Sequence, residues 1–290
     1  MNLHQTALVL EGGGMRGAYS AGVMELFLDK GMIFPYVIGV SAGAANAASY
    51  LSKQKGRNKK VSVEYVSDPR YLSLRNYRKS KQLFGMDFIF GEIPNKLVPY
   101  DYETFFNGES EFIIGTTDCL SGEAVYYGKK DYGENLLLLL KASSSLPFIA
   151  PEISFNNRML LDGGISDSIP IRKAQADGYD KAVVVLTRPK GYRKKPSRMS
   201  FLLRRKYPQY PGLQRAMMNR YKMYNETVDY LEKQEKEGQV VIIRPETVDV
   251  GRMERDLKKL SAFYEQGYKD AEASLSRIEK LVKKDNFLLS

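Results

Sequence analysis

A serine lies between two glycines in the stretch YVIGVSAGAANAASY, residues 36–50, where β-branched residues give way to small helix-forming ones. Gly39, Ser41 and Gly43 form the pattern GxSxG, and the flanking residues predict a turn from a strand into a helix. Such a strained turn holds the hydroxyl clear of the sheet, and the helix directs the positive end of its dipole toward it. We therefore expect Ser41 to be a nucleophile on an elbow made by Gly39 and Gly43. The alternative is a serine that only caps the helix.

A serine hydroxyl is a poor nucleophile until a base takes its proton, and the usual base is histidine. The sequence contains a single histidine, His4. It precedes the first predicted strand and lies eight residues before Gly12, about 26 Å of extended chain at ~3.3 Å per residue. We expect His4 at the edge of the sheet opposite Ser41, so the base must be another residue.

Asp162 is the carboxylate that we expect to lie next to Ser41. It follows an apolar predicted strand and precedes two glycines in LLDGGISDSIPI, residues 160–171. Active sites of α/β proteins lie at the carboxyl-terminal edge of the sheet, where such a carboxylate should emerge. The sequence therefore predicts that Asp162 shares a site with Ser41, whereas Asp167 is expected to cap the start of a helix.

A glycine-rich loop, LEGGGMRG at residues 10–17, also directly follows a predicted strand. Gly12, Gly14 and Gly17 satisfy the dinucleotide-binding pattern GxGxxG, which needs an acidic residue about 20 positions further on to hold the ribose. The second predicted strand ends in Ser41 instead of an acid. The loop is therefore not expected to bind a dinucleotide.

The same loop geometry suits an oxyanion hole. Consecutive glycines turn backbone N–H groups toward the point where negative charge develops in a transition state. We expect Gly12, Gly13 and Gly14 to supply these donors. Arg16 would orient the loop or attract an anionic headgroup, unless it is an ordinary surface arginine.

The composition excludes several classes of protein. The 290 residues, 43% of them hydrophobic, can bury a large core. One cysteine, Cys119, and one histidine leave no internal disulfide and no ligand set for a metal cluster, and no cofactor is expected. The first residues lack the pattern of a secretory signal, and no apolar run approaches the ~18 residues of a membrane span. The predicted location is the cytoplasm.

The chain is strongly basic, with a formal net charge of +10. Its lysines and arginines gather in the segments 53–60, 70–81, 188–198 and 204–206. Such a charge favours nucleic acid or an anionic membrane surface as a partner. No zinc-finger, bZIP or RRM signature is present, so nucleic acid is not expected. Two interpretations stay open, a peripheral membrane contact and a solvated surface, and the oligomeric state is unknown.

Strands and helices alternate along the first 190 or so residues. The predicted strands are TALVLEG, YVIGV, EFIIGTT, AVYYG, RMLLDGG and KAVVVLT, with helices over residues 17–31, 41–54 and 133–145. This order predicts an α/β fold with a mostly parallel sheet. Further on we expect a helix near residues 212–237, an edge strand at QVVIIRP and a long helix over about residues 252–284.

Residues 61–110 fit neither a helical nor a strand period. Tyrosine and phenylalanine are interleaved there with arginine and lysine. One interpretation is a lid that meets lipid, because aromatic and basic side chains both suit a membrane interface. The other is a surface excursion whose aromatic rings pack on the core.

The motifs GGGxRG, GxSxG and DGG, in this order, make the chain similar to the patatin-like phospholipases, including their bacterial members. The segments GTTDCLSGE at 115–123, KASSSLPFIAPE at 141–152 and DGGISDSIPI extend the resemblance, which covers about residues 6–178. One departure is Glu11, where a small or polar residue is more usual, and it bears on the shape of the substrate site. The tail beyond about residue 190 is not covered.

The resemblance implies a patatin-like three-layer α/β/α fold with a mostly parallel central sheet. We assign it to residues 1–188 and expect residues 189–290 to form an α-rich carboxyl-terminal extension packed on this core. The resemblance also implies a Ser/Asp dyad, in which Ser41 is the nucleophile and Asp162 the base, with oxyanion donors from the glycine loop.

The expected activity is two-step hydrolysis of carboxylic esters of lipids, above all phospholipid acyl chains, through an acyl-enzyme. Burial would raise the pKa of the aspartate and make it a stronger base. Acyl transfer or hydrolysis of small esters on the same dyad are alternatives within the enzyme class. The alternative from another class is a lipid-binding regulatory protein that kept the fold without the activity.

Overall fold

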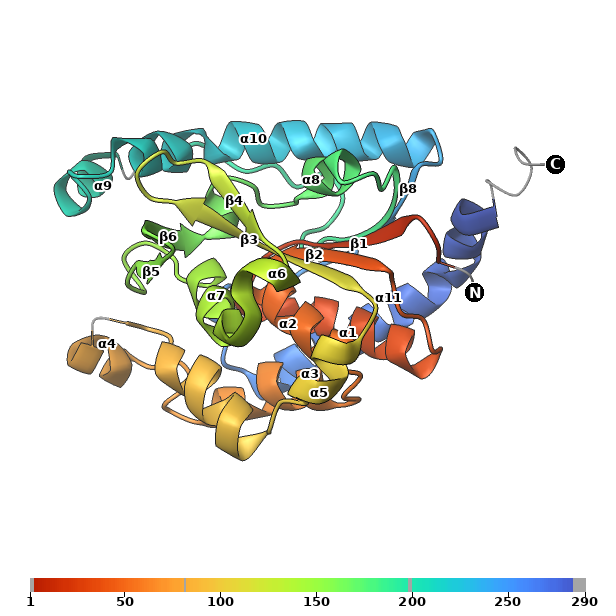
Figure 1. Ribbon diagram of the computed structural model, residues 1–290, viewed down its shortest axis with the longest axis horizontal. Helices are drawn as coiled ribbons and strands as arrows, with labels where there is room; N and C mark the ends of the chain where they lie inside the picture. The colour runs from red at the N-terminus through yellow and green to blue at the C-terminus, as the bar shows by residue number, and fades with distance from the viewer. Residues whose placement is uncertain (1–2, 81, 198–199, 284–290) are drawn as a thin grey trace.

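The computed structural model describes residues 3–80, 82–197 and 200–283, with an eight-stranded sheet at its centre (Figure 1). The strands are β1 (Thr6–Leu10), β2 (Tyr36–Val40), β3 (Glu111–Asp118), β4 (Ala124–Tyr127), β5 (Ile153–Phe155), β6 (Arg158–Asp162), β7 (Lys181–Val185) and β8 (Val240–Ile243). Every residue of β1, β2, β7 and β8 is buried. Strands covered on both faces have little need of alternating polar residues, which explains why these segments are nearly continuous apolar runs.

The strand order in the sheet is β5-β6-β3-β2-β1-β7-β8, with β4 also paired to β3. Strands β3, β2, β1, β7 and β8 run parallel to one another, whereas β4 and β6 are antiparallel to β3, and β5 is antiparallel to β6. The expected mostly parallel sheet is confirmed. The segment QVVIIRP is also confirmed as an edge strand, because β8 ends the strand order beside β7.

Helices cover both faces of the sheet, which confirms the three-layer arrangement. Figure 1 shows α8 and α10 on one face and α1, α2, α7 and α11 on the other. The helices are α1 (Gly17–Asp29), α2 (Ala42–Leu51), α3 (Arg57–Ser62), α4 (Leu74–Ser80), α5 (Tyr102–Asn107), α6 (Lys129–Tyr132), α7 (Leu136–Ser143), α8 (Ile171–Ala176), α9 (Ser200–Lys206), α10 (Pro211–Lys236) and α11 (Leu257–Lys283). Alternate residues of β1 serve the two layers, since Leu8 and Leu10 belong to the core under α1 and Ala7 and Val9 to the core under α10.

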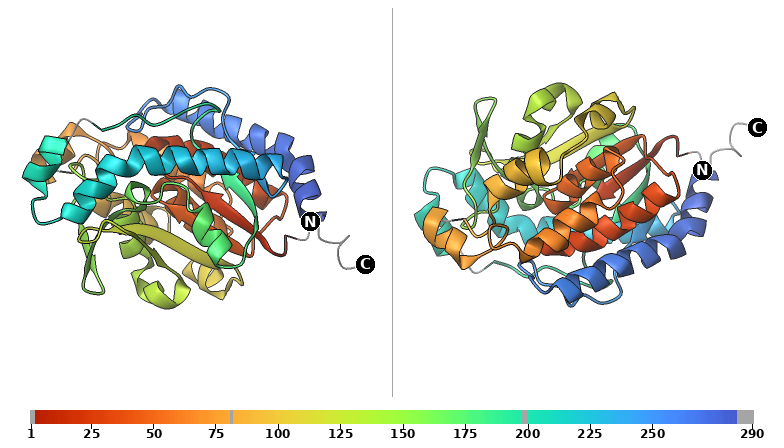
Figure 2. Two further views of the ribbon diagram at one scale, coloured as in Figure 1. Left: turned by 90° about the horizontal axis from the view of Figure 1, so that it is seen from above. Right: turned by 90° about the horizontal axis from the view of Figure 1, so that it is seen from below.

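The carboxyl-terminal helix α11 lies directly along α1 (Figure 2). A Cβ at Gly22 of α1 would come within 1.9 Å of the Tyr264 carbonyl oxygen, and one at Gly267 of α11 within 2.1 Å of the Tyr19 carbonyl oxygen. The Tyr19 hydroxyl also donates to the Asp270 carboxylate at 2.7 Å. The two glycines therefore let the backbones of α1 and α11 touch. The two long helices α10 and α11 confirm the expected α-rich carboxyl-terminal region.

The segment 61–110 consists of short helices and a π-helical stretch, Phe88–Leu97, which includes Pro94. Four of its ten aromatic rings, Tyr71, Phe88, Tyr100 and Phe105, are at most 7% exposed. Four more are partly buried and pack against the core, namely Tyr65, Phe84, Phe90 and Tyr102. The interpretation as rings packed on the core is confirmed for this set.

Neither α10 nor α11, the two longest helices, has the apolar run needed to cross a bilayer, and the same holds for the other helices among the described residues.

Candidate active site

The elbow at Ser41 joins β2 to α2. Ser41 has φ 55° and ψ −130°, a conformation that residues other than glycine rarely adopt. The Ser41 N–H donates to Ser143 Oγ at 2.8 Å, and that hydroxyl donates to the Gly115 carbonyl at 2.6 Å. These two hydrogen bonds hold the strained turn against α7 and β3.

The two glycines of the elbow permit close backbone contacts. A Cβ at Gly43 would lie 2.8 Å from the carbonyl oxygens of Leu10 and Glu11. A Cβ at Gly39 would lie 2.8 Å from the Ala44 nitrogen. The first turn of α2 therefore lies on the end of β1, and a side chain at either glycine would push the elbow away from it.

The glycine loop after β1 lies against the elbow. A Cβ at Gly12 would be 3.0 Å from the Ser41 Cβ. Gly14 has φ +59°, in the left-handed region that favours glycine. Gly12, Gly13 and Gly14 all line the cleft that Ser41 shares with Asp162. The structure thus brings the predicted oxyanion glycines, nucleophile and carboxylate together.

Two contacts hold the glycine loop from other parts of the chain. The Met15 N–H donates to the Arg252 carbonyl at 3.1 Å. The Glu11 carboxylate, 2% exposed, accepts hydrogen bonds from the Thr187 N–H at 2.6 Å and from its hydroxyl at 3.1 Å. Glu11, which departs from the family pattern, therefore ties the start of the loop to the end of β7.

Asp162 is the last residue of β6, and it pairs with Thr116 of β3. One residue earlier, β3 pairs with β2 at Gly115 and Val40, which brings Asp162 level with the elbow. The predicted meeting of Asp162 with Ser41 therefore occurs, although β6 is not one of the parallel strands. Because β6 is antiparallel to β3, it enters from beyond the carboxyl edge of the parallel strands and ends at the elbow.

Two serines that sequence reasoning missed hold Ser41 and Asp162 in place. The Asp162 N–H donates to the Ser145 carbonyl at 2.8 Å, just as the Ser41 N–H donates to Ser143. Both serines belong to the run SSS at the end of α7. The only signal in the sequence was this run itself, after five leucines, within a segment that resembles the family.

The Asp162 carboxyl is 2% exposed, and its Oδ1 accepts a hydrogen bond from the Gly164 N–H at 2.8 Å. Burial raises its pKa above the ordinary value for an aspartate. The charge of Arg220 opposes this rise most, followed by the hydrogen bond from the Ser41 hydroxyl, the Gly164 N–H and the charge of Arg252. The result is a carboxylate with more basic character than an aspartate in water, in the same cleft as Ser41.

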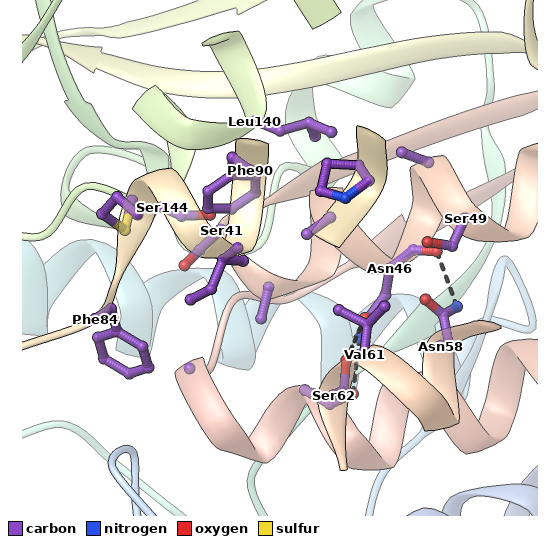
Figure 3. A pocket seen from close by; sticks show the side chains of 18 of the residues that line it. Ser41, Asn46, Ser49, Asn58, Val61, Ser62, Phe84, Phe90, Leu140 and Ser144 are labelled. Carbon is purple, nitrogen blue, oxygen red and sulfur yellow. Dashed lines mark hydrogen bonds between the residues drawn. The ribbon is translucent and has the colours of Figure 1, made fainter. Parts of the chain in front are cut away.

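An apolar cleft of about 980 Å³, including its open mouth, extends from Ser41 between α2, α7 and the segment 61–110. Its walls include Ala45, Val61, Phe84, Ile89, Phe90 and Leu140. Figure 3 shows Ser41 among the lining residues, with the polar side chains of Asn46, Ser49 and Asn58 on the side away from Phe84. A cleft with such apolar walls suits an alkyl chain.

On its other side Ser41 faces a smaller cleft of about 430 Å³, including its mouth. Five cationic side chains line it, and we call it the cationic cleft: Arg16, Arg188, Lys194, Arg220 and Arg252. The predicted basic segment 188–198 contains two of them, and nothing in the sequence pattern marked Arg220 or Arg252. Arg16, expected either to orient the loop or to attract an anion, is buried and lines this cleft.

The remaining candidates lie elsewhere. His4 precedes β1 and lies beside Ile33 and Pro35, at the edge of the sheet opposite Ser41, as expected. Asp167 accepts hydrogen bonds from the Tyr126 hydroxyl and the Ile169 N–H, so it supports the turn before α8 and does not cap that helix. Burial raises the pKa of the Cys119 thiol to about 12, which keeps it protonated. Within the described ranges, no three His, Cys, Asp or Glu side chains form a group that could hold a metal ion.

Comparisons with known proteins match two parts of the chain. Residues 8–174 match the model of the family described as patatin-like phospholipase, and residues 210–283 match a domain of unknown function (DUF6363). The uncharacterized protein YjjU of Escherichia coli K12 is 30% identical over 189 residues, which cover 63% of this chain and 52% of YjjU. The lysophospholipase NTE1 of Coccidioides immitis is 26% identical over 291 residues, which cover 94% of this chain and 18% of NTE1. Among solved structures, VipD from Legionella pneumophila aligns with a TM-score of 0.46 and 12% identity, over 95% of this chain and 67% of that one.

The chain thus spans about half the length of YjjU and less than a fifth of NTE1. The family match at residues 8–174 covers more than half of the 290 residues and includes the glycine loop, the elbow and Asp162. Of the five side chains of the cationic cleft, it includes Arg16 alone. On this match, and on the order and geometry of its three motifs, the chain belongs to the patatin-like phospholipase family.

Proposed function

We propose that the chain is a serine hydrolase that cleaves carboxylic esters of phospholipids, with Ser41 as nucleophile and Asp162 as base. The observation that carries this proposal is the position of Ser41, on a strained elbow between a buried carboxylate and an apolar cleft. Membership of the family, and the similarity to lysophospholipases named NTE1, support a lipid ester as the substrate.

The first step forms an acyl-enzyme. Asp162 takes the proton of the Ser41 hydroxyl while Oγ bonds to the ester carbonyl carbon, and the same proton passes to the alcohol oxygen as its bond to that carbon breaks. In the second step Asp162 takes a proton from water, which attacks the acyl carbon. The fatty acid leaves, and the proton returns to Ser41.

The carbonyl oxygen becomes negatively charged in both steps. Backbone N–H groups of Gly12, Gly13 and Gly14 would donate to it, and the amino-terminal end of α2 adds the positive end of its dipole. Loss of one such donor typically costs about 2.7 to 4 kcal/mol of transition-state stabilisation. The acyl chain would lie in the apolar cleft, where its methylene groups leave water.

We also propose a peripheral contact with an anionic membrane surface at the end of the molecule that carries α4 and α9 (Figures 1 and 2). Leu74 on α4 is 70% exposed, and Phe201 and Leu202 on α9 are 72% and 51% exposed. Basic residues flank them, namely Arg75, Arg78, Lys79, Arg204, Arg205 and Lys206. Exposed apolar side chains with basic neighbours suit the headgroup region of an anionic bilayer.

The decisive test is hydrolysis of a phospholipid, a lysophospholipid and a short-chain ester by the wild type and by Ser41→Ala. We expect the variant to lose at least about 10⁴-fold in kcat, because the remaining groups cannot form the acyl-enzyme. A fluorophosphonate probe should label the wild type at Ser41 and leave Ser41→Ala unlabelled. The matched control is Ser67→Ala, a surface serine outside both clefts.

Two outcomes would overturn the proposal. One is full esterase activity in Ser41→Ala. The other is a wild type that binds lipid vesicles but hydrolyses none of the three esters, which would favour the regulatory lipid-binding protein instead.

A further inference from the structure

The cationic cleft is built almost entirely by the part of the chain that follows the matched family region. Arg188 and Lys194 lie in the loop after β7, Arg220 lies on α10, and Arg252 lies in the segment before α11. These segments bring their cations to one side of Ser41. The alcohol part of an ester lies on that side when the acyl chain occupies the apolar cleft.

The charges that line this cleft are unequal. Against five cationic groups there are two carboxylates among the described lining residues, Glu11 and Asp162, and both accept hydrogen bonds from backbone N–H groups. Arg16 is only 5% exposed, and its Nε has no hydrogen-bond partner within the described ranges. Because a buried cation is costly unless an opposite charge pairs with it, the cleft favours an anion as its ligand.

The cations also repel one another. Burial and the charge of Arg188 lower the pKa of Arg16 to about 10. Burial and the charge of Arg220 lower the pKa of the Lys194 ammonium well below its usual value. An anion that contacts several of these groups at once would relieve this repulsion.

Two aromatic rings of the cleft region are already covered by cations of the protein. The Arg188 guanidinium lies 4.4 Å from the centre of the Tyr192 ring, and the Lys194 ammonium lies 3.1 Å from the centre of the Tyr224 ring. Quaternary ammonium groups are usually recognised by open aromatic faces. A choline-type headgroup would find these two faces occupied and would meet five like charges.

We propose that the cationic cleft binds a phosphomonoester group carried on the alcohol side of the scissile ester. The preferred substrates are then acyl esters of a phosphorylated alcohol, such as acylated glycerol phosphates, and this inference rests on the proposed function. A phosphomonoester carries nearly two negative charges at neutral pH, and guanidinium groups match its oxygens in pairs. The same acyl carbon–oxygen bond is cleaved, and the phosphate stays on the released alcohol.

The choice of test variants follows from the distribution of the cations. Arg220 and Arg252 lower the pKa of Asp162, so their loss would affect the hydrolysis of every ester. Arg188→Gln and Lys194→Gln remove a charge from the cleft while leaving those two in place. The matched control is Arg215→Gln, an exposed residue on α10, which removes the same charge away from the cleft.

The first experiment compares kcat/KM for three substrates with the same acyl chain in neutral detergent micelles: a 1-acylglycerol 3-phosphate, the 1-acylglycerol, and the 1-acylglycerophosphocholine. The wild type should prefer the phosphomonoester by about ten-fold or more over each of the others. Arg188→Gln and Lys194→Gln should each reduce this preference about ten-fold, mainly through KM, because a hydrogen bond to a charged group is lost. Arg215→Gln should leave the preference unchanged.

The second experiment separates a lipid phosphate from free phosphate. Inorganic phosphate is added during hydrolysis of the uncharged ester p-nitrophenyl butyrate, and we expect competitive inhibition that weakens in Arg188→Gln and Lys194→Gln. Inhibition together with the lipid preference supports the headgroup as the ligand. Inhibition without the lipid preference supports a phosphate site that free phosphate fills.

The inference is overturned if hydrolysis depends on Ser41 but the three lipids react with equal kcat/KM and phosphate does not inhibit. Hydrolysis that persists in Ser41→Ala would instead refute the proposed function. Titration of the Ser41→Ala protein with inorganic phosphate by calorimetry would then decide on phosphate binding alone, with Arg188→Gln in the same background as the control.

Discussion

The apolar cleft and the cationic cleft meet at Ser41, and they differ both in chemistry and in origin along the chain. The walls of the apolar cleft come mainly from α2, α7 and the segment 61–110, within the matched family region. Four of the five cations of the other cleft come from residues after it. The elbow and the apolar wall thus belong to the shared family fold, whereas most of the positive charge beside Ser41 comes from the carboxyl-terminal part of this chain.

The largest expected effect is the loss of the base at the junction of the two clefts. Asp162→Asn should reduce kcat at least about 10⁴-fold for every ester, because the amide cannot take the serine proton. The same variant should be more stable than the wild type at neutral pH. The raised pKa means that the folded state binds the proton more tightly than the unfolded state, so stability is lost as pH rises through that pKa.

Thermal unfolding at two pH values checks the second part of this prediction. The advantage of Asp162→Asn should shrink at acidic pH, where the wild-type carboxyl is protonated. Activity in Asp162→Asn near that of the wild type would show that Asp162 is not the base that activates Ser41.

Gly12→Ala should also lower kcat for every ester, because it displaces the glycine loop next to Ser41. The added methyl group would lie 3.0 Å from the Ser41 Cβ and 3.1 Å from the Val40 carbonyl oxygen, so the glycine loop must move. We expect kcat to fall about 10²- to 10³-fold with little change in KM, as when an oxyanion donor is displaced. Gly91→Ala is the control, because no atom lies within 4 Å of its added Cβ, and wild-type kinetics are expected there.

The pH dependence of kcat/KM should change when a charge of the cationic cleft is removed. Asp162 must be ionised to act as a base, so kcat/KM should fall as pH falls through its raised pKa. Removing the positive charge in Arg220→Gln raises that pKa further and moves the acidic limb to higher pH, where activity falls about ten-fold per pH unit. An acidic limb that stays in place in Arg220→Gln, as it should in Arg215→Gln, would contradict the assignment.

The preference for acyl-chain length should change when a larger side chain fills part of the apolar cleft. Ala45→Leu on α2 places three more carbons in the apolar cleft and should lower kcat/KM for long acyl chains about ten-fold, while short esters react normally. Ala273→Leu, at an exposed position on α11, should leave the chain-length profile unchanged. Equal losses for long and short chains would point to a distorted elbow and would weaken the assignment of this cleft to the acyl chain.

The smallest expected effect concerns the binding of the protein to a lipid surface. Phe201→Ala on α9 should weaken sedimentation with anionic vesicles about three- to ten-fold, because less apolar area enters the interface. Phe106→Ala on α5, 38% exposed, is the matched control. Equal binding to neutral and anionic vesicles would remove the electrostatic part of the proposed contact.

Much of the site could be predicted because its motifs directly follow strands. The glycine loop after β1 and the elbow after β2 are local patterns, and parallel neighbouring strands bring their carboxyl ends together. The orientation of β6 was missed, although a signal was present. Asn156 and Asn157 both have positive φ and form the two-residue turn of the β5–β6 hairpin.

Other features could not be predicted because they depend on contacts between distant parts of the chain. The hydrogen bonds that Ser41 and Asp162 donate to Ser143 and Ser145 depend on how the end of α7 meets β2 and β6. The cationic cleft draws on several segments, and single arginines such as Arg220 on a long polar helix carry no pattern of their own. The helices of segment 61–110 could not be predicted from the spacing of apolar residues. They are short, and the π-helical stretch among them follows neither a period of 3.6 nor a period of 2.

The contact between α1 and α11 also bears on the order in which the parts of the site are made. The glycine loop and the elbow are synthesised early, but the carbonyl that holds Met15 belongs to Arg252, in the segment that leads into α11. Gly22 and Gly267 let α11 settle on α1 and so fix this segment. A growing chain on the ribosome therefore contains the elbow and the glycine loop well before it contains Arg252, whose carbonyl accepts the hydrogen bond from the Met15 N–H.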